Sequence, residues 1–258
     1  MTARTDRRVA LGIGVVLAVG FIISTAVQVA GWTVGSVEHN VHKVIPGPVR
    51  SLTVEAGSGD VTLVPATTGD VTIDSRVTGT LHAPAIEVRP TGARVVVSGG
   101  CSEITFGHCS TQITISVPAG TAVNVDAASG DIHAAGLSGN ADLRTSSGDV
   151  RVSDLRSFSV RLESASGDVE ASNLRTSTVR ARTASGDIDL QLLNAPDAAD
   201  AETSSGNVTI LVPPGPESYR VDADTDSGDT KLDVSRSARA QRLLRAHTNS
   251  GNVTVTYE

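Results

Sequence analysis

The fold of this chain is decided by a pattern that one stretch shows in full: VRLESASGDVEA, residues 160–171. Its Ser-Gly-Asp triplet recurs as Ser-Gly-Asp or Ser-Gly-Asn, and from Gly130 onward successive glycines lie 18, 19, 19, 20, 22 and 23 residues apart. Such a period indicates a chain that stacks one small unit repeatedly. The Gly-Asx pairs of the eight units are Gly59 and Asp60, Gly130 and Asp131, Gly148 and Asp149, Gly167 and Asp168, Gly186 and Asp187, Gly206 and Asn207, Gly228 and Asp229, and Gly251 and Asn252.

Apolar residues flank each glycine at fixed alternate positions. In the quoted unit they are Val160 and Leu162 before the glycine and Val169 and Ala171 after it, and across all units only Thr230 breaks the rule. Alternation predicts strands with one buried face, so each unit should be strand, Gly-Asx bend, strand and second bend. Glycine tolerates positive φ, and Asp or Asn can hydrogen-bond nearby backbone. We therefore predict that all the Gly-Asx pairs are structural turn residues.

Two architectures fit these units, an antiparallel sandwich of hairpins and a β-solenoid of stacked coils. The sign of the charge four residues before the glycine alternates over five successive units, at Asp126, Arg144, Glu163, Arg182 and Glu202. In-register coils would make these residues lateral neighbours, where opposite charges are favoured, whereas a hairpin array gives no reason for the alternation. Asp224 interrupts the series with the same sign as Glu202. We predict an all-β, single-stranded, right-handed parallel β-solenoid with coils of about 19–23 residues.

The N-terminal region contains an uncharged apolar segment, residues 9–30, preceded by three arginines. This segment is long enough to cross a bilayer as one helix, and the positive flank predicts a cytoplasmic N-terminus. We expect a cytoplasmic tail at 1–8 and an uncleaved transmembrane signal anchor at 9–30. The chain would then be a single-pass cell-membrane protein, mostly extracytoplasmic. The alternative is a signal peptide that is cleaved near residues 24–26.

The rest of the chain divides by composition and by the regularity of the repeat. Residues 31–50, which contain several glycines and prolines, are expected to form a stalk. Residues 51–118 should be irregular N-terminal coils with a disulfide loop, and 119–258 the regular β-solenoid. Ser235–His247 is the widest second bend and is expected to form a short helix over one end. The strand at Val253–Tyr257 would then be the open last coil.

Cys101 and Cys109 are the only cysteines, and an even number in an exported chain predicts a structural disulfide. The functional alternative is a redox or metal pair. A zinc site normally needs four ligands, and only His108 lies nearby, so this alternative is disfavoured.

The charge and the motif aspartates limit the partners. With 21 Lys and Arg against 28 Asp and Glu the chain is acidic, which argues against nucleic acid as a partner.

A solenoid would align the motif aspartates in a column, Asp131, Asp149, Asp168 and Asp187. Carboxylate pairs can cleave glycosides and oxygen-rich columns can bind calcium, so weak divalent cation binding stays open. A catalytic site occurs once, however, so repetition favours turn formation, and we expect no catalytic, metal or cofactor site.

The string Ile113-Thr114-Ile115-Ser116-Val117-Pro118-Ala119-Gly120-Thr121, which runs into Val123–Val125 and Ser129–Ile132, resembles the bacterial putative-adhesin β-strand-repeat family over residues 50–258. The resemblance implies a membrane-tethered β-helical domain of unknown function. The resemblance implies no catalytic residues for this chain. Some members of the family are associated with cell-envelope stress responses.

We therefore expect a non-enzymatic, membrane-anchored extracytoplasmic β-solenoid. It would act as an adhesin or as a cell-envelope interaction module that binds an envelope polymer or a protein. The alternative is a sensory component of envelope stress signalling. Because residues 1–8 are too short to transmit a signal alone, that role needs a membrane partner. A polysaccharide-active enzyme is a minor alternative, disfavoured because aromatic residues make up only 2% of the chain.

Overall fold

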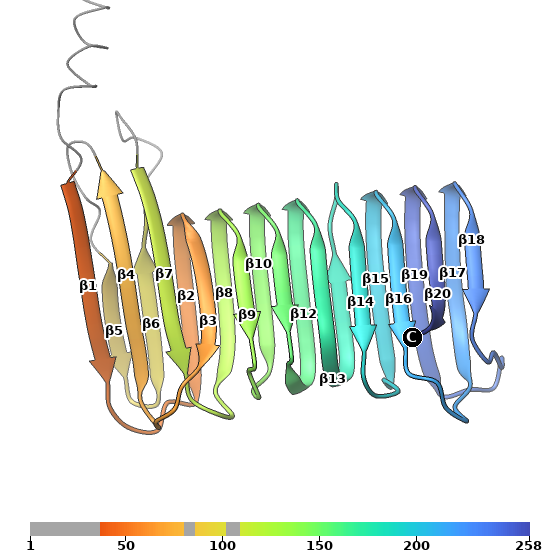
Figure 1. The fold of residues 1–258 in the computed structure, drawn as a ribbon, viewed down its shortest axis with the longest axis horizontal. Coiled ribbons are helices and arrows are strands. Elements are labelled where there is room, and N and C mark those ends of the chain that lie inside the picture. Colours follow the sequence, from red (N-terminus) through yellow and green to blue (C-terminus); the bar gives the residue numbers. More distant parts are fainter. Residues whose placement is uncertain (1–36, 80–85, 102–108) are drawn as a thin grey trace, which may run out of the picture.

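The computed structural model describes residues 37–79, 86–101 and 109–258, which form strands in two facing layers (Figure 1). In spatial order, sheet A contains β1 (Val37–Ile45), β4 (Val71–Gly79), β7 (Cys109–Val117), β3 (Asp60–Pro65), β9 (Ile132–Ala135), β11 (Val150–Ser153), the first part of β13 (Val169–Arg182), β14 (Ile188–Leu192), β16 (Val208–Val212), β20 (Val253–Tyr257) and β18 (Thr230–Asp233). Sheet B contains β5 (Glu87–Thr91), β6 (Arg94–Gly99), β2 (Ser51–Ser58), β8 (Ala122–Ser129), β10 (Ala141–Ser147), β12 (Arg156–Ser166), the second part of β13, β15 (Ala198–Ser205), β19 (Arg242–Ser250) and β17 (Tyr219–Ser227).

The core lies between the two sheets and is built from the alternate apolar positions of every unit. Val160 and Leu162 of β12 and Val169 and Ala171 of β13 are each at most 1% exposed. Equivalent residues of neighbouring units continue this core along the stack. The alternation therefore predicted the buried face correctly, because side chains in a strand point to opposite sides at successive residues.

The lateral pairing confirms the solenoid and excludes the hairpin array. Strands β8, β10 and β12 are parallel and in register, so Arg144 lies between Asp126 and Glu163. In the same way Arg182 lies between Glu163 and Glu202. The predicted alternation of charge is thus a column of neighbouring side chains.

The N-terminal end departs from the parallel pattern. Strand β4 pairs antiparallel with both β1 and β7, and β5 pairs antiparallel with β6. Part of the expected stalk belongs to the folded domain, because Val37–Ile45 form strand β1. In these described ranges no helix is long and apolar enough to span a bilayer. The predicted anchor, residues 9–30, lies outside them.

The order of the units along the stack differs from their order in the sequence at the C-terminal end. Strands β19 and β20 lie between the unit of β15 and β16 and the unit of β17 and β18 (Figure 1). The prediction of Val253–Tyr257 as the open last coil was therefore wrong, since β20 is paired on both sides. The expected helix at Ser235–His247 is also wrong. Its first half is an irregular bend, and Arg242 begins β19.

This insertion explains both exceptions in the repeat. His247 of β19 lies between Glu202 and Asp224, so the two carboxylates are not neighbours. Thr230 belongs to the terminal unit, where its side chain is exposed and does not need to be apolar.

We predict that His247→Asp lowers the free energy of unfolding by about 0.5–2 kcal/mol, because three carboxylates would then lie side by side. Urea unfolding of the full chain measures this. The matched control is His133→Asp, whose lateral neighbours are Thr62 and Arg151, and which should be neutral or stabilising. Equal losses in the two variants would contradict the role of the charge column.

Candidate functional site: the Gly-Asx corner column

The Gly-Asx pairs lie where each unit passes from sheet B to sheet A, and we call each pair with its preceding serine a corner. Every corner glycine has positive φ, between 119° and 150°, which L side chains rarely adopt. Glycine is also required for space. A Cβ on Gly186 would collide with the carbonyl oxygen of Gly167 in the preceding unit, and the same holds for Gly167 against Gly148. The corners therefore stack with direct contact between backbones.

The Asx side chain connects neighbouring corners. The backbone N–H of Asp168 donates to Asp149 Oδ1, and that of Asp187 donates to Asp168 Oδ1, both at 2.8 Å. The series runs from Asp60 through Asn207 and Asn252 to the last unit. The backbone group that each Asx side chain bonds belongs to the next unit rather than to the same bend. Because Asn and Asp both have an Oδ1 acceptor, either residue serves.

A hydroxyl column three residues before the glycine completes the corner. Thr183 Oγ1 donates to the carbonyl of Gly167, and Ser164 Oγ to that of Gly148, both at 2.9 Å. This hydrogen bond was not predicted from the sequence. The recurrence of a hydroxyl could have predicted it, since Ser or Thr occupies this position in every unit except the two that carry Ala56 and Ala127.

The corner carboxylates are arranged for stacking. One oxygen of each corner carboxylate except Asp229 accepts the N–H of the next unit, and Asp149 Oδ2 also pairs with Arg151 at 2.5 Å. Within the described residues no group of three or more His, Cys, Asp or Glu side chains is placed to hold a metal ion. The corner carboxylates thus act as hydrogen-bond acceptors that connect neighbouring units.

The outer face of sheet B carries two columns of charge. Ion pairs join Arg182 to Glu202 and Arg180 to Asp200, each at 2.9 Å. Arg161 donates to Glu163, and this hydrogen bond raises the pKa of the guanidinium. Exposed pairs are worth only about 0.2–1 kcal/mol each, so they specify the register more than they add stability. The hollows on this face at β8, β10 and β12 and at β12, β13, β15 and β19 are partly open to solvent.

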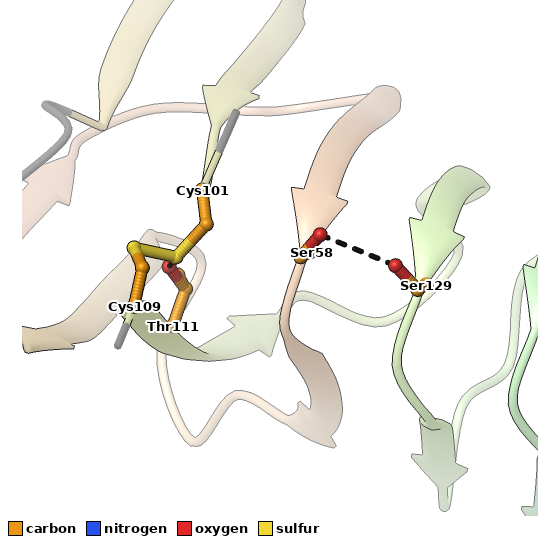
Figure 2. Close-up of a disulfide and its surroundings, with 5 residues drawn as sticks. All are labelled: Ser58, Cys101, Cys109, Thr111 and Ser129. Atoms are coloured by element: carbon orange, nitrogen blue, oxygen red, sulfur yellow. Dashed lines mark hydrogen bonds between the residues drawn. A yellow bond between two sulfur atoms is a disulfide. The ribbon is translucent and has the colours of Figure 1, made fainter. Parts of the chain in front are cut away.

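The predicted disulfide between Cys101 and Cys109 is present, with its Cα atoms 5.9 Å apart (Figure 2). It links Cys101, the second residue after β6, to the first residue of β7, and so joins sheet B to sheet A. Cys101 is bridged to Ser58 by backbone hydrogen bonds, and Ser58 Oγ lies 3.2 Å from Ser129 Oγ of the next corner. The disulfide therefore lies where the next unit, formed by β6 and β7 beside the Gly59 corner, would otherwise have its own corner.

Comparisons with known proteins agree with this fold. The profile of the Toastrack DUF4097 family matches residues 32–256. A putative adhesin from Bacteroides fragilis NCTC 9343 aligns with a TM-score of 0.50 and 17% identity, over 85% of this chain and 97% of that chain. A putative adhesin from Parabacteroides distasonis ATCC 8503 aligns with a TM-score of 0.46 and 12% identity, over 88% and 98%. No curated protein matches this chain.

We predict that Gly186→Ala lowers the free energy of unfolding by roughly 2–4 kcal/mol, because it combines an unfavourable φ with a backbone collision. Gly69→Ala is the matched control, since Gly69 also precedes an aspartate but a Cβ there meets nothing within 4 Å. Its stability should be unchanged in the same urea titration. If both variants unfold like the wild type, close contact of corners is not what the glycines provide.

We predict that replacing both cysteines by serine lowers the free energy of unfolding by about 2.5 kcal/mol, the chain-entropy value for so short a loop. Reductant should lower the stability of the wild type by the same amount and leave the double variant unchanged. Unfolding midpoints that do not respond to reductant in the wild type would show that the disulfide is not required at this corner.

Proposed function

This chain belongs to the Toastrack DUF4097 family, and from that membership we propose that it is a non-enzymatic adhesin or cell-envelope interaction module. It would be displayed outside the cell by the membrane anchor at residues 9–30. The observation that carries the proposal is the use of the repeated motif. The polar groups that recur in each unit bond to the neighbouring unit, as Asp168 does with Asp149 and Asp187, and are not gathered in a cleft.

The shape of the domain supports a binding role. Two long outer faces carry regularly spaced polar and charged side chains, and the hollows on the described surface are open. A surface of this kind suits contact with an extended polymer or a protein better than enclosure of a small substrate. The Bacteroides fragilis structure that shares this fold is described as a putative adhesin, which is in line with the proposal.

The test compares cells that produce the full chain with cells that produce a corner-disrupted variant, Gly148→Val with Gly167→Val and Gly186→Val. Each added side chain would collide with the preceding corner, while residues 9–30 and the net charge are kept. Attachment of cells to surfaces and survival of envelope stress should fall to the level of cells without the chain. Gly69→Ala is the control and should behave as the wild type.

Three results would count against the proposal. One is full attachment and survival with the corner-disrupted variant, provided that immunoblotting finds it in the membrane fraction. A second is release of reducing sugars from envelope polysaccharide by the purified full chain, which would make the protein an enzyme. A third is crosslinking of a membrane protein to residues 9–30 with stress survival lost and attachment intact, which would favour the sensory role.

A further inference from the structure

The stack of units ends in an open pair of strands, β17 and β18. Among the described strands each pairs with one other, β17 with β19 and β18 with β20. Half-buried apolar side chains of this unit, Val221, Ala223 and Leu232, cover the end of the core. Only the start of β17 is covered further, where Tyr219 exchanges backbone hydrogen bonds with Ser235 and Ser237.

The outer edge of β17 presents unpaired backbone groups. In interior units the equivalent residues bond outward to the next unit, as Val123 N–H does to the Asn140 carbonyl at 2.8 Å. Thr183 N–H likewise bonds to the carbonyl of Glu202 at 3.1 Å. Val221 and Thr225 occupy these two positions in the last unit, and within the described residues nothing pairs with their N–H groups. An open edge of this kind is a template for another strand.

The last corner is also incomplete. The Asx side chain of every other unit accepts a backbone N–H from the next unit along the stack. Asp229 Oδ1 has no such donor among the described residues. The carbonyl of Gly228 likewise lacks the Ser or Thr hydroxyl that the carbonyls of Gly206 and Gly251 receive. One more unit stacked on this end would provide partners for the unpaired backbone groups of β17 and for the free acceptors of the last corner.

The charges on β17 define what that unit must carry. Asp222, Asp224 and Asp226 are exposed at alternate positions along the strand. On the inner side Arg245 lies between Asp200 and Asp222, and it pairs with Asp222 at 3.1 Å. Continuation of the columns on the outer side requires cations beside Asp222 and Asp224.

We propose that the outer edge of β17 binds an extended segment of a partner protein that carries Arg or Lys at alternate positions, and that the segment pairs with β17 as an added strand. A second copy meeting this end would bring its own aspartates against Asp222, Asp224 and Asp226, so self-association is disfavoured. The inference rests on the proposed role as an interaction module and assigns that role a surface and a partner chemistry.

The chain itself contains a segment with the required pattern. Residues 177–184, Ser-Thr-Val-Arg-Ala-Arg-Thr-Ala, pair in parallel with β15. There Arg180 and Arg182 each lie 2.9 Å from a carboxylate, Asp200 and Glu202 respectively. Asp222 and Asp224 hold the same positions in their unit, so this segment is a suitable probe.

The test measures fluorescence anisotropy of a labelled 177–184 peptide titrated with the full chain. Binding should be saturable, should weaken with added salt, and should fall by about threefold to thirtyfold in Asp222→Asn with Asp224→Asn. The matched control is Glu55→Gln with Asp126→Asn, which changes the net charge equally in units that are paired on both sides. A peptide with both arginines replaced by glutamate should not bind.

Absence of peptide binding to the wild type overturns the inference, as does equal weakening in the control variant. A third contrary result is a wild type that binds no peptide while Asp222→Asn with Asp224→Asn forms dimers, because the aspartates would then only protect the edge from self-association. None of these outcomes alters cell attachment by the full chain, so they are distinguishable from failure of the proposed function.

Discussion

Close contact between the glycine corners of neighbouring units is the constraint on which the rest of this structure depends. Because Gly186 has no Cβ, its backbone can approach the carbonyl of Gly167 directly, and the Asx side chain and the Ser or Thr hydroxyl can reach the adjacent corner. Strands on both sides of the corner are thereby held at the spacing of a β-sheet, about 4.8 Å. The in-register core and the charge columns follow from that spacing, because it places equivalent residues of adjacent units side by side.

The unit could be predicted from the sequence, whereas the order of the units could not. Alternate apolar residues and the charges at Arg144, Glu163 and Arg182 depend on contacts within a unit or with adjacent equivalents, and these are visible in a periodic pattern. The position of β19 and β20 depends on two connecting bends of similar length, and a local pattern does not specify which way a bend leads. The two irregularities of the repeat, Asp224 and Thr230, carried this information. Both are natural in a terminal unit and hard to explain in an interior one.

The sequence indicated which residue types stand at the corners, but it did not predict which backbone groups the Asx side chains bond. Gly and Asx favour bends in any protein, so local reasoning placed the hydrogen bond within the bend, while the stack moves it to the next unit. The disulfide shows the same limit. Pairing of Cys101 with Cys109 follows from their being the only cysteines, but their place beside Ser58 and the Gly59 corner depends on how β6 and β7 flank β2 and β3.

The insertion of β19 and β20 has a consequence for the order in which the chain can fold. Strands β17 and β18 precede them in the sequence, yet β19 and β20 are the strands with which they pair in the described part of the chain. During synthesis, residues 219–233 leave the ribosome with a gap one unit wide between them and β15 and β16, and they remain without a partner until residues 242–257 have emerged. The last two units must therefore assemble together and late, as one cooperative block, while the interior units can each form on a completed neighbour. The end of the molecule that presents the open edge is thus also the part whose formation waits for nearly the whole chain.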